Sequence, residues 1–238
     1  RLCQDLGVEA KNTISFFEGN ENERTAQVLD LLKQGSDVLL VTDAGMPTIS
    51  DPGYKLVREA INAKINIEVI PGPSAVITAL TLAGLPTNRF CFEGFVPRTQ
   101  GLREKFFSKL VTEERTIVFF EAPHRLHSTL MTAQEIFGKK RAIAICREMT
   151  KQYEETFRGT IEEAVEWSGS KEILGEITVV IGGAELDSRE YSPQEIAFKV
   201  NEYIDSGVDR KEAIALVAES LTIPKRKVFD AMVVHKNQ

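Results

Sequence analysis

Four short polar segments of this chain each follow an apolar run and contain residues that bind ligands. They are TDAGMPTISDPG (42–53), PGPSA (71–75), EAPHR (121–125) and CREMTK (146–151). Glycine lets a ligand approach the backbone closely, proline stiffens a loop, and serine or aspartate supplies hydrogen bonds. A helix cap explains one such segment on its own. Four of them in one chain indicate a shared ligand-binding cleft.

Several familiar catalytic and phosphate-binding motifs do not occur in the sequence. It has no G-x-x-x-x-G-K-[ST] phosphate loop and no G-x-G-x-x-G after an apolar run. The PGPSAV segment is not a nucleophile elbow, because proline and alanine flank Ser74. His124 and His127 are spaced so that both rings can meet a metal, but no further cluster has zinc-like spacing. We therefore expect surface histidines and no metal ion.

The distribution of charge is more informative than the net charge of −6. Residues 97–151 carry 11 basic and 6 acidic side chains, whereas residues 1–96 carry 8 and 12, and residues 152–188 carry 2 and 9. The acidic total argues against a protein that coats nucleic acid. One basic segment can still bind an anionic polymer locally. A solvated basic face with no partner is the alternative.

The elements that must position the four segments follow from hydrophobic patterning. Apolar runs alternate with helical patterns over the first two thirds of the chain, which favours an α/β architecture with largely parallel sheets. The expected strands are residues 12–17, 37–42, 65–70, 90–95, 115–121, 141–148 and 175–183. The expected helices are residues 21–34, 53–62, 73–84, 101–111, 124–137 and 160–168. In open α/β sheets, ligands bind at the carboxyl ends of the strands, where the polar segments lie.

A breaker segment, AGLPTNR (83–89), indicates a domain boundary. We expect an N-terminal α/β domain over residues 1–87, a second α/β domain over residues 88–187, and a small helical appendage over residues 188–238.

The appendage is expected to contain three short helices. Ser192 with Glu195, and Asp209 with Glu212, have the spacing of capping boxes, and a third helix follows Pro224. Helices two and three resemble a helix-turn-helix, with basic residues 225–227 opening the last helix. Contact with nucleic acid, internal packing and dimer formation remain alternative roles for this appendage.

Cysteine usage and hydropathy limit the cellular setting. Cys3, Cys91 and Cys146 are scattered and odd in number, which indicates a reducing cytoplasm and no disulfide framework. No apolar run reaches the length of a membrane span, and no signal-peptide pattern opens the chain. We expect a cytoplasmic protein without a membrane partner.

Taken together, the segments resemble a known family. TDAGMPTISDPGYKLV, VIPGPSAVITALTLAGLP, RFCFEGFVPR, IVFFEAPHRL, CREMTKQYEETFRGT and GEITVVIGG occur in the order typical of the small-subunit rRNA methyltransferases of the tetrapyrrole methylase superfamily. These are class III S-adenosylmethionine-dependent enzymes. The resemblance covers nearly all of residues 1–185 and implies two α/β domains with a cofactor cleft between them. Family members normally begin with a strand and an ATPIGN-like loop, so the first strand-loop-helix unit is expected to be missing before Arg1.

The resemblance implies which residues contact S-adenosylmethionine. The first two polar segments and the end of the strand at 115–121 line the cofactor pocket. The implied cofactor residues are Asp43, Ala44, Gly45, Met46, Ser50, Asp51, Pro71, Gly72, Ser74, Ala75, Phe120 and Glu121.

The reaction implied is methylation of the ribose 2′-hydroxyl of a cytidine in small-subunit (16S) rRNA. Such a transfer depends on in-line positioning, and a base helps because the hydroxyl must lose its proton. Glu121, Glu148 and Asp51 are candidate bases by motif position, and the sequence does not choose among them. The candidate RNA contacts are Arg98, Arg125, Arg147 and Lys151, with ordinary salt bridges as the alternative. The resemblance also implies a homodimer.

Two other functions remain open at this point. One is a methylase of the same superfamily that acts on a tetrapyrrole or a modified protein residue. The other is a non-catalytic, cofactor-binding factor in ribosome assembly. The SDPGY and EAPHR segments and the helical appendage favour the rRNA enzyme.

Overall fold

The computed structural model describes residues 3, 7–9, 12–42, 45–184, 191–221 and 223–236. The chain divides into two compact units, Arg1–Gly182 and Gly183–Gln238. The expected domain boundaries at residues 87/88 and 187/188 stay predictions.

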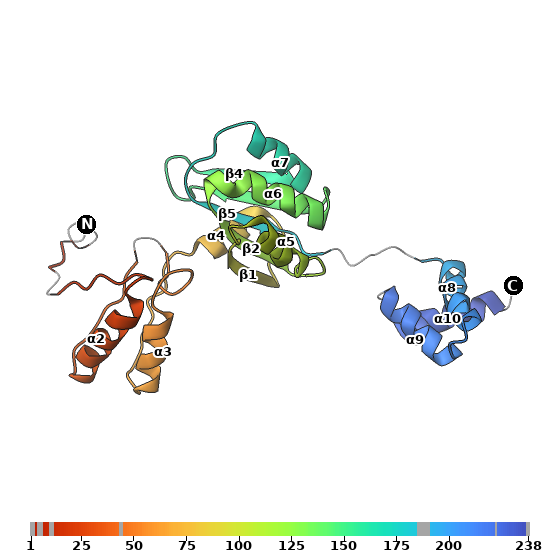
Figure 1. Ribbon diagram of the computed structural model, residues 1–238, viewed down its shortest axis with the longest axis horizontal. Helices are drawn as coiled ribbons and strands as arrows, with labels where there is room; N and C mark the ends of the chain where they lie inside the picture. Colours follow the sequence, from red (N-terminus) through yellow and green to blue (C-terminus); the bar gives the residue numbers. More distant parts are fainter. Residues whose placement is uncertain are drawn as a thin grey trace. The chain divides into compact units, whose positions relative to one another are not determined.

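A mixed five-stranded sheet forms the centre of the first unit (Figure 1). The strand order is β1-β2-β5-β3-β4, and only β1 and β2 are parallel among the four neighbouring pairs of this sheet. The strands are β1 (Phe90–Phe95), β2 (Thr116–Glu121), β3 (Ala142–Arg147), β4 (Glu155–Thr160) and β5 (Ile177–Ile181). The expectation of a largely parallel sheet is therefore wrong. A parallel return needs a long crossover, whereas the short connection from β3 to β4 permits only an antiparallel pair.

Helices cover both faces of this sheet. One face packs against α5 (Gln100–Ser108), α6 (Pro123–Phe137) and α7 (Ile161–Gly169), and the other against α4 (Ala75–Ala83). Side chains alternate along each strand, so Ile117 and Phe119 of β2 belong to the first core while Val118 belongs to the second. The sheet is thus a buried layer that fixes the ends of its strands. Four expected strands of this region are confirmed, whereas β4 was not expected.

The N-terminal part contains α2 (Glu21–Lys33) and α3 (Tyr54–Asn62), which pack against each other. Residues 12–17, 37–42 and 65–70, expected as strands, have no strand pairing among the described residues. Leu39 and Ile70 in these segments are exposed. An apolar run favours extended chain, but a strand also needs a neighbour for its backbone hydrogen bonds. The three strand expectations are wrong for that reason.

The second unit is a bundle of α8 (Pro193–Asp205), α9 (Arg210–Ser220) and α10 (Lys225–Lys236) around its own apolar core. Ser192 and Glu195 form a complete capping box, as expected. The Asp209 side chain accepts a hydrogen bond from the backbone of Lys211 at 3.0 Å, and so holds the start of α9. The three expected helices are confirmed.

Within the described residues, none of the helices is both long and apolar enough to cross a membrane. The same residues contain no group of three His, Cys, Asp or Glu side chains that could hold a metal ion.

Candidate cofactor and substrate site

The carboxyl ends of three strands lie at one edge of the sheet. β1 is parallel to β2, and β2 and β3 are both antiparallel to β5, so all three run in the same direction. Glu121 at the end of β2 and Arg147 at the end of β3 are both register partners of Ile177. The segments 121–125 and 146–151 therefore start on either side of one central strand, as a shared site requires.

Glu121 is enclosed by hydrogen-bond partners and is only 2% exposed. Thr129 donates to its Oε2 at 2.6 Å, the Ala122 N–H donates to its Oε1 at 2.7 Å, and Arg125 Nη2 lies 2.5 Å from Oε1. Arg125 also donates to the Val96 carbonyl at 3.3 Å, which ties the ends of β1 and β2 together. These contacts favour a structural role. The assignment of Glu121 as cofactor contact and candidate base stays a prediction.

An aromatic cluster lies beside Glu121. The Phe120 ring centroid is 4.9 Å from that of Phe92 and 5.4 Å from that of Phe95. The register of β1 shifts between Phe92 and Phe95, where Gly94 has a φ of 68°, a value that suits glycine. Phe95 is 57% exposed, so this edge of the sheet presents an aromatic surface.

Glu148 is held in a loop of unusual backbone geometry. Its φ is 49° and that of Thr150 is 64°, both in the left-handed region. Its carboxylate accepts the Glu176 N–H at 2.8 Å and the Lys151 Nζ at 3.0 Å. The Glu176 N–H, and then Lys151, hold the pKa of Glu148 below its usual value. Glu148 is thus ionised at neutral pH, and its lowered pKa makes it a weak proton acceptor.

Within the loop 42–53, Gly45 and Met46 lie close to the segment at 71–75. The Gly72 N–H points at Met46 Sδ at 3.2 Å. A Cβ at Gly45 would lie 3.5 Å from the Pro73 carbonyl oxygen. Two of the four polar segments therefore approach each other through glycine backbone, as close ligand approach requires.

The remaining residues of this loop pair are only partly constrained. Thr42 Oγ1 donates to Asp51 Oδ2 at 3.1 Å, and Ser50 is exposed with a φ of 56°. Pro71 is exposed, and Ser74 is the N-cap of α4, which begins at Ala75. Asp43 and Ala44 lie outside the described residues. The cleft expected between the two α/β domains stays a prediction.

The candidate RNA contacts divide into one exposed arginine and three residues with internal partners. Arg98 is exposed in the connection after β1. Arg125 pairs with Glu121, Arg147 lies 3.1 Å from Glu155, and Lys151 bridges Glu148 and Glu176. Arg147 also donates to the Leu174 carbonyl at 3.2 Å. These three residues therefore form salt bridges within the chain, which was the alternative to RNA contact.

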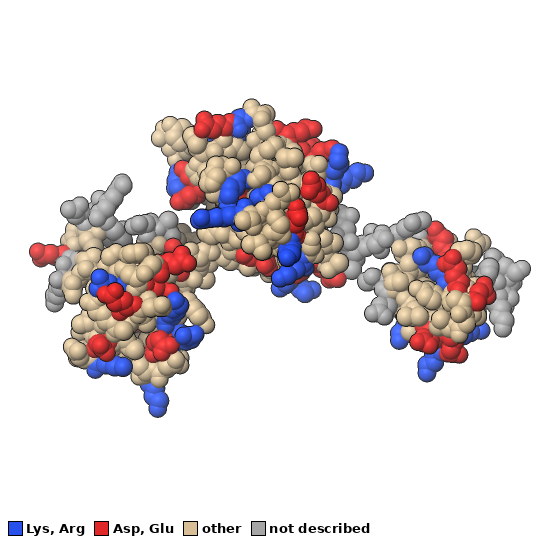
Figure 2. Space-filling view, viewed as in Figure 1, with Lys and Arg blue, Asp and Glu red and all other residues tan. Residues whose placement is uncertain are grey.

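In the view of Figure 2, acidic and basic side chains are interspersed over the sheet unit, which contains the basic segment 97–151. Part of the excess positive charge of segment 97–151 is engaged in hydrogen bonds within the fold. Arg103 is buried and donates to Thr132 at 3.0 Å, and Arg141 donates to the carbonyls of Gly182, Val111 and Glu113.

Two contacts that shape these loops were not expected from the sequence. They are the Glu21 carboxylate on the Gly53 N–H and the Thr129 hydroxyl on Glu121. An acidic residue in the first turn of a helix is ordinary, so the position of Glu21 did not indicate a contact with Gly53. Thr129 lies within a helix on its buried face, where threonine is also unremarkable.

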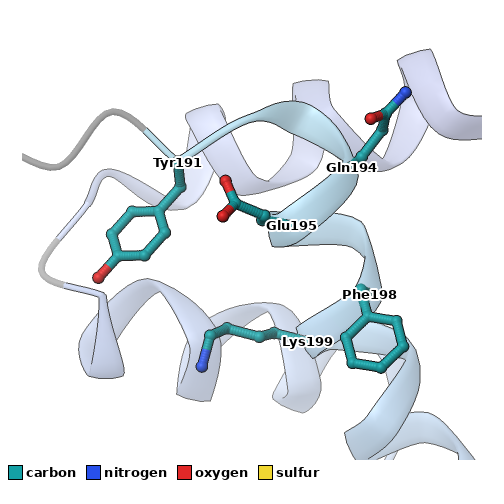
Figure 3. Close-up of a pocket in the computed structure, with 5 residues that line it drawn as sticks. All are labelled: Tyr191, Gln194, Glu195, Phe198 and Lys199. Carbon is teal, nitrogen blue, oxygen red and sulfur yellow. The ribbon is translucent and has the colours of Figure 1, made fainter.

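A further depression lies on the helical unit and contains none of the expected site residues. It has a volume of about 360 Å³ and is lined by Tyr191, Gln194, Glu195, Phe198 and Lys199 (Figure 3). Glu195 already serves in the capping box of α8. Nothing in its chemistry connects this depression with the strand-end loops.

Comparison with known proteins gives consistent results. The family model "Tetrapyrrole (Corrin/Porphyrin) Methylases" matches residues 2–165. "Ribosomal RNA small subunit methyltransferase I" of Mycobacterium tuberculosis is 43% identical over 220 residues, which are 92% of this chain and 76% of that protein. The protein of the same name from Thermotoga maritima is 48% identical over 175 residues, 74% of this chain and 78% of that protein.

Among solved structures, a diphthine synthase superposes with a TM-score of 0.55 at 16% sequence identity, over 76% of this chain and 72% of that one. At that identity the likeness is one of fold. The chain thus has an α/β tetrapyrrole methylase-like fold with a mixed sheet and C-terminal helices.

Proposed function

This chain belongs to the tetrapyrrole methylase family, and we propose that it transfers the methyl group of S-adenosylmethionine to a cytidine ribose 2′-hydroxyl in small-subunit (16S) rRNA. The observation that carries the proposal is the 43% identity over 92% of the chain to a protein named ribosomal RNA small subunit methyltransferase I. Because its 220 aligned residues exceed the first unit, which ends at Gly182, the similarity extends into the helical unit.

Two loops of the chain support the binding of this cofactor. The segments 42–53 and 71–75 approach at Gly45, which lies near the Pro73 carbonyl and has no side chain of its own, and at Gly72, whose N–H faces Met46 Sδ. We propose that the remaining implied cofactor residues, including Ser74 at the start of α4 and Phe120 at the end of β2, complete this site. Bound S-adenosylmethionine supplies a methyl group that its sulfonium charge already activates.

The chain's own contribution is positioning and the removal of one proton. Transfer of a methyl group from bound cofactor would require the chain to hold the ribose oxygen in line with that group and one side chain to accept the 2′-hydroxyl proton. Glu121 has three partners around its carboxylate, which supports a positioning role for it rather than proton removal. Glu148 also has two partners and a lowered pKa, so Asp51 is the better candidate for the base and Glu148 the alternative. Rates of Asp51→Asn and Glu148→Gln variants measured against pH would separate them.

Recognition of RNA, assembly and location complete the proposal. Arg98 is proposed as a phosphate contact because it is exposed, and Arg125, Arg147 and Lys151 as residues that hold the strand-end loops. We further propose that the chain works as a homodimer in the cytoplasm.

The deciding experiment is methyl transfer from radiolabelled S-adenosylmethionine to three acceptors: small ribosomal subunits, free small-subunit rRNA and uroporphyrinogen. Label in rRNA at a cytidine 2′-O supports the proposal. Label in uroporphyrinogen alone would assign the chain to the tetrapyrrole branch of the family. Cofactor binding without transfer to any acceptor would indicate the non-catalytic alternative.

A further inference from the structure

Glu21 is a buried acid at the first position of α2, where an acidic side chain would ordinarily face water. It is 8% exposed. Its Oε1 accepts the Gly53 N–H at 3.0 Å, and its Oε2 lies 3.3 Å from Lys55 Nζ. Burial of a carboxylate is unfavourable unless hydrogen bonds and a cation compensate, and this side chain has both. Its contacts reach 32 residues along the chain to the end of the 42–53 loop.

That loop contains two non-glycine residues in the left-handed region of the backbone. Thr48 has a φ of 76° and Ser50 a φ of 56°, conformations that cost an L-residue about 1 kcal/mol or more each. Gly53 has a φ of 129°, and a Cβ there would lie 2.7 Å from Leu40 Cδ2. Strained residues persist only where the surroundings fix them.

Among the described residues, three hydrogen bonds that restrain this loop can be compared, and they differ in strength. The Thr42–Asp51 bond is only partly buried, so water competes with it, and Gly72 with Met46 uses a sulfur acceptor, which is weak. The Gly53 N–H on Glu21 is a buried hydrogen bond to an ionised acceptor, and such bonds are roughly twice as strong as neutral ones. The Gly53 N–H, and then Lys55, lower the pKa of the Glu21 carboxyl, as a bond to the ionised form requires.

We infer that Glu21 is a positioning residue for the reaction: its carboxylate fixes Gly53 and Lys55, and through them holds residues 45–53 of the loop in their strained backbone conformation. The inference rests on the proposed function only for the identity of the ligand. The fixing of the loop is a property of the chain itself. Lys55 also donates to Asn22 at 2.9 Å, so the first two residues of α2 both bind the start of α3.

The test compares Glu21→Gln with Glu23→Gln, a change of the same type on the exposed side of the same first helical turn. Glu23 has a side chain that is 78% exposed and lies no nearer than 4.0 Å to Arg24. Hydrogen exchange of the backbone amides at residues 45–53, Pro47 and Pro52 excepted, reports the loop without any cofactor. Loss of a charge-assisted hydrogen bond predicts about tenfold faster exchange and about tenfold weaker S-adenosylmethionine binding in Glu21→Gln. The kcat at saturating cofactor and rRNA should stay within about twofold, because Glu21 does not touch the reacting atoms.

Wild-type exchange and affinity in Glu21→Gln would overturn the inference, and so would a fall in kcat with cofactor affinity unchanged. Equal effects in Glu23→Gln would overturn it too, because they would trace the change to helix charge. If Glu21→Gln does not fold, Lys55→Met takes its place, with the same effects expected at smaller size. If the wild type fails to bind S-adenosylmethionine, the proposed function fails, and the exchange comparison alone still decides the role of Glu21.

Discussion

Glu21 and Glu121 share two kinds of partner although they belong to different parts of the first unit. Each is a buried acid that accepts one backbone N–H and faces one cation, Lys55 for the first and Arg125 for the second. Such acids hold turns of the chain at defined distances. Substitution of single residues can therefore distinguish acids that hold the structure from acids that take part in the reaction.

Glu121→Gln should lower the free energy of unfolding by about 3 kcal/mol, because it leaves Arg125 largely buried without its anion. Urea denaturation measures the change. Glu135→Gln, an exposed acid on the same helix α6, is the control and should change stability by less than about 0.5 kcal/mol. A Glu121→Gln protein as stable as the wild type but without methyl transfer would instead assign Glu121 to the chemistry.

Gly45→Val should weaken S-adenosylmethionine binding at least about tenfold, because a β-branched side chain at a φ of 81° both strains the backbone and fills the space near Pro73. The matched control is Gly35→Val. Gly35 has a φ of 88° and open space around its Cβ position, so it carries the same conformational cost away from the loops. Calorimetry that finds equal affinity in the two folded variants would refute the placement of the cofactor at Gly45.

The pair Glu113 and Arg115 should make stability depend on acid pH. The Arg115 side chain and then its N–H lower the pKa of Glu113 from 4.5 to about 2. A lowered pKa in the folded state adds stability that is present above pH 4.5 and is lost as the pH falls toward 2. Arg115→Met should remove part of this loss, so its unfolding free energy should fall less steeply than that of the wild type across this window. Parallel curves from denaturant titrations would contradict the assignment.

At the scale of elements, the sheet shows what patterning can and cannot predict. Strands such as β2, TIVFFE, are continuous apolar runs, and their place in a buried sheet followed from that. β4 could not be predicted from hydrophobic patterning because its sequence, ETFRGT, is mostly polar. The strand lies half-exposed at the edge of the sheet. The direction of β5 is not encoded in its own residues, since any buried run fits either direction. Segment 37–42 shows the converse, an apolar run whose backbone pairs with no other described strand.

The same limit applies to the candidate site. Motif order indicated which loops carry function, but only the structure shows that three of four basic candidates are engaged in internal pairs. Spacing along a chain does not show the partners that approach from other segments. Glu155 for Arg147 and Glu176 for Lys151 are both such partners.

Arg98→Gln and Arg147→Gln should therefore behave differently toward RNA. Loss of one phosphate contact reduces the salt dependence of binding by about one released counterion, and this is expected for the exposed Arg98. Arg147→Gln should loosen the loop beyond β3 while leaving the slope nearly unchanged, because its charge is already paired with Glu155. RNA affinity across a salt series distinguishes the two. A reduced slope for Arg147→Gln alone would invert the assignment.

At the scale of the whole molecule, two cores are built independently. The sheet unit and the helical unit each enclose their own apolar cluster, and each carries exposed apolar side chains such as Ile70 in the first and Phe198 in the second. Exposed apolar surface of this kind is available for association between chains.

Sedimentation at micromolar concentration should show a dimer if the proposed assembly is right. Association through apolar surface depends little on salt, so the dimer should persist at high ionic strength. A chain that sediments as a monomer under both conditions would contradict the proposal.

The central place of β5 has a consequence for how the protein is made. β5 is the last strand of the sheet to be synthesised, yet it lies between β2 and β3 and pairs with both. A nascent chain that has not yet released residue 181 therefore holds two half-sheets with open inner edges. Unpaired edges attract other strands. We therefore expect chaperones on the ribosome to bind this protein at a late stage of synthesis, until β5 is released. The helical unit, which follows in sequence, is then the part still emerging while the sheet closes.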